Sequence, residues 1–453
     1  MKISVNSKKE YQNFEGFGAS GAWWAQAVGG WTHTDEESGA PTNKRIAELL
    51  YSKENGIGLR IYRYNLGGGS RNSGSSVFPN KNRMAESFDK GNGQYDWSRD
   101  KNAVNMMRLC VEAGAEEVIL FSNSPPERLT KNHKSCLDKA WRSNLPRKNE
   151  EGFAKYLLDC AEHFIKEGIP VKYISPVNEP LWVWTEKNGQ EGCHYTPYGV
   201  YSLLKKTASA LEKRTALKGV KLSACENGDI RWFNKTYTFA TLLNKTTRRN
   251  CDGIDVHSYC LPIPLKFLNN RAGFLKRYRK FLDIFFPGVP VKMSEWCHMK
   301  GGRDKGMDSA LECAKVIYED ISILGVSSWQ HWIAVSEVDY CDGLIYINEE
   351  EKTFELTKRL FVTGNFSKYI PYNAKRIDIT CDDKSVLPLS FTKDGKTVVI
   401  LINPAKDEKE LNIDFAEKAL IAVTDNENDL TESTVSGEKI LKITPSSVTT
   451  IVY

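Results

Sequence analysis

The sequence lacks long apolar runs and paired cysteine motifs. No stretch of its 453 residues approaches the about 18 consecutive apolar residues that span a bilayer. The first residues, MKISVNSKK, contain no apolar segment typical of a secretory signal. The 11 cysteines are odd in number and form no CxxC pair, and the closest two, Cys251 and Cys260, lack a second pair to complete a zinc site. We therefore expect free thiols in a reducing compartment, no bound metal, no membrane span and a cytoplasmic location.

The chain also has little excess charge of either sign. It carries 62 Lys and Arg against 57 Asp and Glu, a net charge of +5 on a chain that is 26% charged. An excess this small and dispersed predicts neither nucleic acid nor an anionic membrane as a partner. Tryptophan, in contrast, is plentiful, with 11 residues. We expect about half of these to fill the core, and others to offer flat faces to sugar rings.

Helical and strand patterns alternate from about residue 50 to residue 335. Apolar residues recur at helical spacing in 100–113, 151–167, 197–214, 272–285 and 308–323. Strands are expected at 14–18, 59–64, 117–121, 171–175, 220–224, 253–257, 290–294 and 325–330. This succession predicts the α/β class and a (β/α)8 barrel, whose active site lies at the carboxyl ends of the strands. A doubly wound open sheet is the alternative, disfavoured because Gly67-Gly68-Gly69 lacks the GxGxxG spacing.

Beyond about residue 365 the pattern changes to short strands separated by Asp-Gly, Asn-Pro and charged turns. The expected strands are 386–391, 397–403, 410–415, 419–424 and 448–453. They predict a small antiparallel β-sandwich attached to the barrel, which a strand near residues 2–5 would join. We therefore expect an N-terminal strand in 1–13, a barrel in 14–362 and a sandwich in 363–453.

Two glutamates stand at the ends of predicted barrel strands. Glu179 follows the strand at 171–175, and Glu295 ends the strand that begins at residue 290. Side chains at these ends point toward one site. Two carboxylates there suit glycoside hydrolysis, in which one donates a proton and the other is nucleophile or base. A solvated loop residue or a barrel salt bridge is the usual explanation for a single acidic residue, but the strand ends favour the catalytic one.

Seven motifs, in this order and spacing, resemble family 30 of the glycoside hydrolases over nearly the whole chain. They are Phe14-Glu15-Gly16-Phe17-Gly18, Tyr62-Arg63-Tyr64-Asn65, Ser122-Asn123-Ser124-Pro125-Pro126, Asn178-Glu179-Pro180, Asp255-Val256-His257-Ser258-Tyr259, Ser294-Glu295-Trp296 and Trp329-Gln330-His331-Trp332. The segment 364–370 is similar to that family's return into its sandwich. Asn-Glu-Pro alone is only suggestive, whereas the ordered set is specific.

The resemblance implies a retaining, two-step displacement through a covalent glycosyl-enzyme, with no metal and no organic cofactor. Glu179 would be the acid/base, with a raised pKa, and Glu295 the ionised nucleophile, with Arg63 as its charge partner. The two carboxyl groups of a retaining enzyme stand about 5–5.5 Å apart. Asn178 would hydrogen-bond the 2-hydroxyl of the sugar in the reactive subsite.

The other expected substrate contacts are imidazole and aromatic side chains. His257 and Tyr259 alternate along the sixth strand and therefore face one side. By resemblance they line the pocket, with Tyr259 donating a hydrogen bond to Glu295, and Trp332 forms the floor, while Trp329 belongs to the core. The remaining candidates are tryptophans for which core packing is the alternative: Trp24 beside Trp23, Trp182, Trp184 and Trp296.

Two departures from the family pattern bear on the substrate. Glu127-Arg128-Leu129 stands where many members have an aromatic residue, so a subsite there would be more polar. The loop 334–340 carries Glu337 and Asp339, which would repel a glucuronate-substituted xylan. The Trp23-Trp24 pair and the segment 62–69 look closest to the branch that contains β-1,6-galactanases.

We therefore expect a carbohydrate substrate, most simply β-1,6-galacto-oligosaccharides or related short imported glycans cut by exo action. Alternatives within the family are β-xylosidase or xylobiohydrolase, β-glucosidase and glucosylceramidase-like activity, and transglycosylation through the same intermediate. A catalytically silent carbohydrate-binding protein is disfavoured because both glutamates, Asn178 and Arg63 are present.

Overall fold

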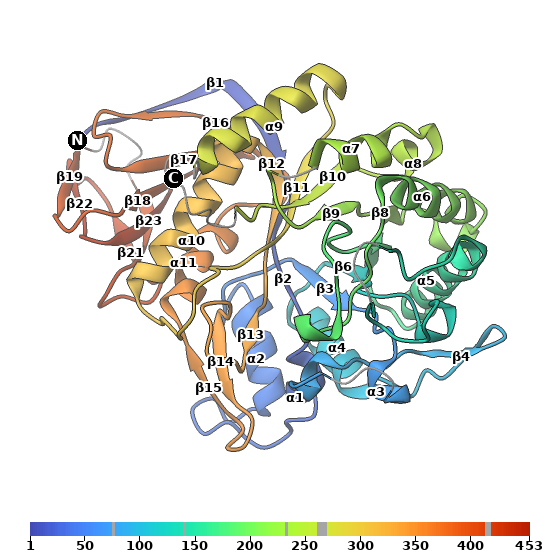
Figure 1. Ribbon diagram of the computed structural model, residues 1–453. Helices are drawn as coiled ribbons and strands as arrows, with labels where there is room; N and C mark the ends of the chain where they lie inside the picture. The colour runs from blue at the N-terminus through green and yellow to red at the C-terminus, as the bar shows by residue number, and fades with distance from the viewer. Residues whose placement is uncertain (75–77, 139–141, 232–233, 261–269, 413–417) are drawn as a thin grey trace. The chain divides into compact units, whose positions relative to one another are not determined.

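The main sheet is parallel and has nine strands. A computed structural model describes residues 1–74, 78–138, 142–231, 234–260, 270–412 and 418–453. The strand order is β8-β7-β6-β3-β2-β12-β11-β10-β9, and the elements are labelled in Figure 1. The bounds are β2 (Gly16–Ser20), β3 (Ile61–Asn65), β6 (Glu117–Phe121), β7 (Val171–Ser175), β8 (Lys221–Leu222), β9 (Cys225–Asn227), β10 (Ile254–His257), β11 (Val291–Trp296) and β12 (Val326–His331). The predicted α/β barrel class is confirmed.

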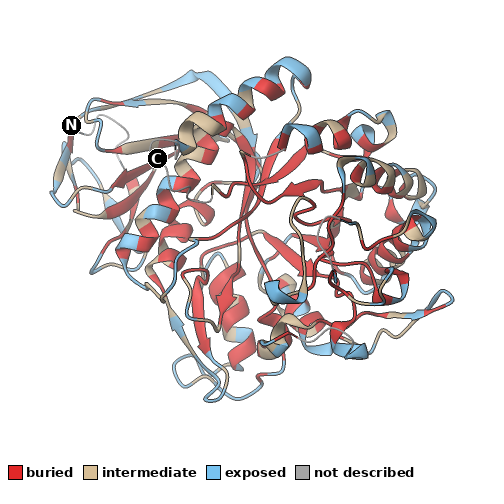
Figure 2. Ribbon diagram, in the orientation of Figure 1, coloured by how far each residue is buried: buried red, intermediate tan, exposed pale blue. Residues whose placement is uncertain are grey.

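Several of these strands are buried at every position. β3, β6, β11 and β12 show no alternation of buried and exposed residues, as their burial colour shows in Figure 2. Parallel strands covered on both faces are expected to be apolar without a period of two. Polar residues on such strands are therefore costly to bury, and their positions mark candidate functional groups.

The fifth predicted strand, at 220–224, is wrong in its bounds. It divides into the short strands β8 and β9, and β9 ends at Asn227. The interruption has a local cause, because the Ala224 N–H donates to the Asp255 carboxylate at 2.9 Å and not to a strand partner. The corrected strand brings Glu226 into the sheet.

The five predicted helices are confirmed with small shifts, as α4 (Lys101–Ala113), α5 (Glu150–Lys166), α6 (Pro197–Leu211), α9 (Arg271–Phe285) and α10 (Met307–Glu319). α5 shows why: Glu150 and Glu151 lie in its first turn and Lys166 in its last, complementing the helix dipole. Further helices are α1 (Ala25–Val28), α2 (Thr42–Tyr51), α3 (Ser70–Ser73), α7 (Asn234–Leu242), α8 (Lys245–Asn250) and α11 (Lys358–Ser367). No helix among the described residues has the length and apolarity to cross a membrane.

A separate antiparallel sheet has seven strands in the order β1-β16-β17-β18-β23-β20-β21. Their bounds are β1 (Ile3–Phe14), β16 (Ala374–Cys381), β17 (Leu387–Lys393), β18 (Lys396–Asn403), β20 (Ala419–Thr424), β21 (Thr431–Val435) and β23 (Ser447–Val452). The N-terminal β1 pairs with β16. β19 (Lys409–Asn412) pairs with β22 (Ile440–Ile443), and residues 413–415 of the predicted strand 410–415 lie outside the described residues. Leu401, Leu411, Ile421, Ile443 and Ile451 belong to the buried core here.

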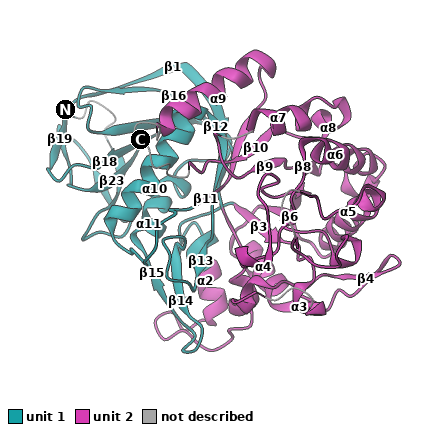
Figure 3. Ribbon diagram, in the orientation of Figure 1, with its two compact units in different colours: residues 1–18, 48–60, 297–453 teal, residues 19–47, 61–296 magenta. Residues whose placement is uncertain are grey.

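Smaller sheets complete the fold. They are β4 (Asp89–Gly91) with β5 (Gln94–Tyr95), and β13 (Val335–Ser336) with β14 (Ile345–Asn348) and β15 (Thr353–Leu356). The chain has two compact units: Met1–Gly18, Glu48–Arg60 and Cys297–Tyr453 form one, and Ala19–Ala47 and Ile61–Trp296 form the other, as coloured in Figure 3. The division at residues 13 and 362 stays a prediction.

Candidate active site

Five charged side chains meet at or near the carboxyl ends of five strands, all within the unit formed by Ala19–Ala47 and Ile61–Trp296. They are Arg63 on β3, Glu179 after β7, Glu226 on β9, His257 on β10 and Glu295 on β11. Side-chain exposure is 0% for Arg63, Glu226 and His257, 6% for Glu295 and 11% for Glu179. The β10–β11 register places His257 beside Glu295. A cluster of this kind needs compensating charges, and it contains them.

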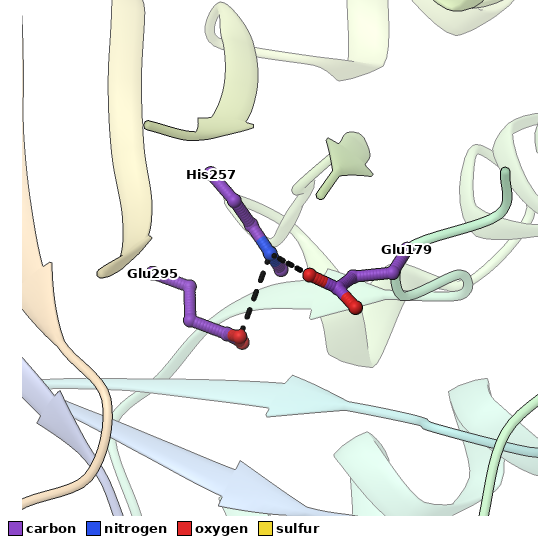
Figure 4. Close-up of side chains that lie close together, drawn as sticks. All are labelled: Glu179, His257 and Glu295. Atoms are coloured by element: carbon purple, nitrogen blue, oxygen red, sulfur yellow. Dashed lines mark hydrogen bonds and ion pairs between the residues drawn. The ribbon is translucent and has the colours of Figure 1, made fainter. Parts of the chain in front are cut away.

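The two predicted catalytic glutamates share one histidine. His257 Nδ1 lies 3.1 Å from Glu179 Oε1 and 3.5 Å from Glu295 Oε1, as the dashed lines in Figure 4 show. One carboxylate oxygen of each glutamate and a ring nitrogen of His257 all lie within 4.8 Å of one another. Retaining glycosidases hold their carboxyl groups about 5–5.5 Å apart, and inverting ones about 6.5–9.5 Å apart. The spacing therefore suits a retaining reaction.

Glu295 has the surroundings of a carboxylate held ready to attack. Arg63 Nη1 donates a hydrogen bond to Glu295 Oε2 at 2.5 Å. The Tyr259 hydroxyl donates to Glu295 Oε1 at 3.4 Å. Both donors bind the charged form, and Arg63 has no unprotonated form in proteins. The predicted pairing of Arg63 and Tyr259 with Glu295 is present.

Glu179 has different neighbours. Its backbone N–H donates to the Glu226 carbonyl at 2.8 Å, which ties the loop after β7 to β9. Burial raises the pKa of the Glu179 carboxyl, although the hydrogen bond from His257 and the charge of that ring act in the opposite direction. None of the described residues donates a hydrogen bond to Glu179 Oε2. A protonated carboxyl with one uncommitted oxygen is what a general acid requires.

A relay of amides joins this cluster to two further strand ends. Arg63 Nη2 donates to Asn178 Oδ1 at 2.8 Å, Asn178 Nδ2 donates to Asn123 Oδ1 at 3.0 Å, and Asn123 Nδ2 donates to Asn65 Oδ1 at 3.3 Å. Because a guanidinium only donates, the Asn178 oxygen must face Arg63. The amide plane of Asn178 is thereby set. Asn123 was not among the predicted site residues, although it lies in one of the motifs.

Glu226 is the functional residue that sequence reasoning missed. Its carboxylate lies 3.0 Å from His257 Nε2 and 3.5 Å from Arg63 Nη2. It also accepts hydrogen bonds from three serine hydroxyls, those of Ser175 at 3.0 Å, Ser223 at 2.9 Å and Ser294. Burial alone would raise the pKa of Glu226, but Arg63 and His257 outweigh it and hold the pKa at about 2. The signal was available, because Glu226 ends the fifth strand as Glu179 and Glu295 end theirs.

His257 is held as a cation. Burial disfavours the imidazolium, but Glu295, Glu179 and Glu226 together raise the pKa of His257 to about 10. By spacing alone, Glu179, His257 and Glu295 could hold a metal ion. A metal ligand must be a neutral imidazole, however, and the Arg63 guanidinium already occupies Glu295. The donor set therefore suits acid–base chemistry better than a metal.

The predicted tryptophans have different surroundings. The half-buried Trp182 and Trp184 both contact the Glu179 carbonyl, through the Trp182 N–H at 3.1 Å and Trp184 Nε1 at 3.3 Å. Trp24 is buried and its Nε1 donates to the Ser20 carbonyl at 2.9 Å, and Trp296 is buried too. Trp332 is half-buried and belongs to the other unit. A substrate role for each of these five stays a prediction.

Glu127 does not offer a free carboxylate to a subsite. Its side chain accepts hydrogen bonds from the Ser135 N–H at 3.0 Å and from the Ser73 hydroxyl, and the residue is buried. The adjacent Arg128 is exposed and pairs with Asp89 at 2.8 Å. The departure at 127–129 therefore anchors its own loop.

Known proteins with similar sequences point to one family. Residues 1–244 and 285–346 match the model of O-Glycosyl hydrolase family 30. The chain is 28% identical over 286 residues to an endo-β-1,6-galactanase of Hypocrea rufa, covering 57% of this chain and 55% of that protein. It is 27% identical over 251 residues to an exo-β-1,6-galactobiohydrolase of Bifidobacterium longum subsp. longum, covering 43% and 16%. The matches thus span about half or less of these curated relatives.

Solved structures share the fold over the whole chain. A conserved exported protein from Bacteroides fragilis superposes with a TM-score of 0.87 at 24% identity, covering 100% of both chains. The catalytic domain of the family 30 xylanase C from Talaromyces cellulolyticus has a TM-score of 0.74 at 19% identity, covering 100% of this chain and 99% of that one. The architecture and the sequence match agree, and the chain belongs to O-glycosyl hydrolase family 30.

Proposed function

We propose that the protein is a retaining β-glycoside hydrolase in which Glu179 is the acid/base and Glu295 the nucleophile. The family is a retaining one. One observation carries the assignment of roles: the two glutamates share His257, yet only Glu295 is paired with Arg63, while Glu179 is buried with Oε2 uncommitted. Environments that push two carboxyl groups apart in acidity separate the acid from the nucleophile.

The chemistry follows from these positions. A Glu295 oxygen attacks the anomeric carbon while Glu179 passes its proton to the glycosidic oxygen, so the aglycone leaves and an ester bond joins the sugar to Glu295. Glu179, now a carboxylate, takes a proton from water as that water attacks the same carbon and releases Glu295. Asn178 uses one Nδ2 hydrogen on Asn123, and the other is the donor we assign to the 2-hydroxyl of the sugar.

The substrate we propose is a short β-1,6-linked galacto-oligosaccharide. Two relatives of the chain are named for action on β-1,6-linked galactose polymers or their fragments. Exo action on imported oligosaccharides would fit the cytoplasmic location that the cysteine usage favours. β-xylosidase, β-glucosidase and glucosylceramidase-like activities of the same family are the competing specificities.

Two substitutions separate the catalytic roles. Glu179→Ala should retain activity on dinitrophenyl β-glycosides, whose leaving group needs no proton, and lose about 10²–10⁴-fold on unactivated oligosaccharides. Glu295→Ala should be inactive on both. Added azide should give a β-glycosyl azide with Glu179→Ala and an α-glycosyl azide with Glu295→Ala. Interchanged azide products would reverse the two roles, and full activity in both variants would refute the proposal.

Product analysis tests the substrate. Wild-type enzyme is incubated with β-linked galacto-, gluco-, xylo- and fuco-oligosaccharides, and the products are separated by chain length. We expect galactose or galactobiose to be released from the β-1,6-galacto series. Longer first products would contradict exo action, and preference for another series would replace the sugar while leaving the catalytic pair unchanged.

A further inference from the structure

His257 faces three carboxylates and has no uncommitted ring nitrogen. Nε2 lies 3.0 Å from Glu226 Oε2, and Nδ1 lies 3.1 Å from Glu179 Oε1 and 3.5 Å from Glu295 Oε1. The ring is fully buried. Ionised carboxylates only accept hydrogen bonds, so an imidazole that faces them on both sides is best matched when both nitrogens carry hydrogen. The geometry is that of an imidazolium.

Glu226 is a fixed anion that the double displacement does not use. Three hydroxyls, from Ser175, Ser223 and Ser294, donate to its carboxylate, and Arg63 lies 3.5 Å away. The serines come from β7, from the segment between β8 and β9, and from β11, so three parts of the sheet hold Glu226 in place. Its side chain has 0% exposure. A buried carboxylate with this many donors is ionised and immobile.

We propose that Glu226 is a positioning residue that keeps His257 as a permanent imidazolium, so that one stationary cation faces the negative charge as it moves between Glu295 and Glu179. This inference rests on the catalytic roles proposed above. Nothing in those roles requires Glu226, and its contribution is made through His257 and Arg63.

The charges of the cluster balance at each stage. Before reaction Arg63 and His257 are positive, Glu226 and Glu295 are negative, and Glu179 is protonated. When the ester forms, Glu295 loses its charge to the new bond to the anomeric carbon, and Glu179 becomes negative as its proton leaves with the aglycone. The His257 N–H then lies next to the new carboxylate at Glu179 Oε1, as it lay next to Glu295 Oε1 before. A neutral imidazole would leave one buried negative charge uncompensated.

The groups that face His257 come from each neighbouring strand. Glu226 on β9, Glu179 after β7 and Glu295 on β11 favour the cation. Arg63 on β3 contacts Glu226 and Glu295 and is the opposing positive charge. Tyr259 follows His257 with the ring centroids 6.0 Å apart, and its hydroxyl donates to Glu295. Three acids against one base leave the imidazolium favoured, in agreement with the high pKa of this ring.

The test is the protonation state of His257, read by ¹⁵N NMR of protein labelled at its 7 histidines. His257 is assigned as the signal lost in His257→Gln. In wild type we expect both ring nitrogens to stay protonated from pH 5.5 to pH 9. In Glu226→Gln we expect the same ring to titrate within that range, whereas Glu226→Asp should keep the imidazolium because the charge remains. Glu150→Gln removes another buried carboxylate, paired with Lys206 at 3.1 Å, and should leave the His257 signal unchanged.

Kinetics supply the second readout. Glu226→Gln should lower kcat by about 10- to 100-fold, the usual cost of losing a group that orients a functional histidine, with KM changed little. The loss should be greater at pH 8 than at pH 6, because the variant loses the imidazolium as pH rises. A neutral His257 in wild type, or a Glu226→Gln variant with the imidazolium intact at pH 9, would overturn the proposal. The wild-type spectrum needs no variant to fold and no substrate, so it is independent of the proposed hydrolase activity.

Discussion

At the scale of single residues, chemically identical side chains acquire different roles from their neighbours. Glu179, Glu226 and Glu295 are all buried glutamates, yet Arg63 pairs closely with Glu295, three serines hold Glu226, and Glu179 keeps one oxygen uncommitted. Glu179 and Glu226 also have positive φ, 43° and 56°. Such conformations cost about 1–3 kcal/mol in residues other than glycine and persist where the surrounding structure imposes them.

Gly228 provides a direct test of how closely Glu179 is packed. A Cβ at this position would lie 2.4 Å from Glu179 Oε1 and 2.4 Å from Trp182 Nε1. Gly228→Ala should therefore displace the acid and lower kcat/KM by about 100-fold, the cost of a misplacement near 1 Å. The measurement is hydrolysis of the best β-glycoside. Gly301→Ala, where an added Cβ meets nothing within 4 Å, is the control and should retain activity. Unchanged activity in Gly228→Ala would exclude Glu179 from the reaction.

The pH dependence of stability should show the His257 cation. The folded pKa of His257 is about 10, above its ordinary value of 6.5, so its contribution is complete below pH 6.5 and is lost as pH rises toward 10. His257→Gln should therefore unfold about 3–5 kcal/mol more easily than wild type at pH 6, with the difference narrowing by pH 10. Urea-unfolding midpoints at several pH values measure this difference.

A second buried histidine gives the opposite sign and serves as the control. Burial lowers the pKa of His331 to about 3, so its folded form is penalised as pH falls below 6.5. The difference between wild type and His331→Gln should therefore narrow toward acid pH and not toward alkaline pH. Parallel pH profiles for the two histidine variants would contradict both assignments.

At the scale of elements, the parallel strands bring distant residues into one cluster. Arg63 and Glu295 are 232 residues apart in the chain but lie 2.5 Å apart in the fold. A register shift between Val256 and His257 aligns His257 with Glu295. A slip of one residue in β10 would turn His257 to the other face of the strand, so the β10–β11 register determines whether the cluster forms.

The N-cap of α11 offers a test of an element away from the candidate site. Thr357 accepts a hydrogen bond from the Leu360 N–H at 3.3 Å and donates one to the Leu344 carbonyl at 2.7 Å, and it is buried. Thr357→Val keeps the shape but removes both bonds, so the free energy of unfolding should fall by about 1–2 kcal/mol. Chemical denaturation measures the change. Thr357→Ser keeps the hydroxyl and should lose less, and equal losses would show that the methyl group matters and not the cap.

At the scale of the whole molecule, the cysteines behave as an apolar component of the fold. All 11 are free, ten are buried, and Cys260 alone is partly exposed. Burial raises the pKa of the Cys110 and Cys160 thiols well above the ordinary value. Unreactive buried thiols of this kind fill space and are shielded from oxidants.

Thiol titration examines this property directly. With Ellman's reagent the native protein should release about one equivalent quickly, from Cys260, and 11 equivalents after denaturation without reductant. Cys260→Ser should abolish the fast phase. Fewer than 11 reactive thiols in denaturant would mean that a disulfide forms, and several fast thiols in the native protein would mean that the core opens readily.

The sequence alone determined the fold class, the order of the barrel strands and the pair Glu179 and Glu295. Hydrophobic periodicity is a local property that specifies strands and helices, and parallel strands direct their carboxyl ends to one side. The tertiary structure decided the rest: the division of the fifth strand, the entry of Glu226 into the site, the relay through Asn123 and the burial of Glu127 by its own loop. These depend on strand register and on contacts between residues tens to hundreds of positions apart, which periodicity does not encode. Two carboxylates at strand ends announced a reaction, and a third, found only in the folded chain, supplies the buried charge that holds His257 between them.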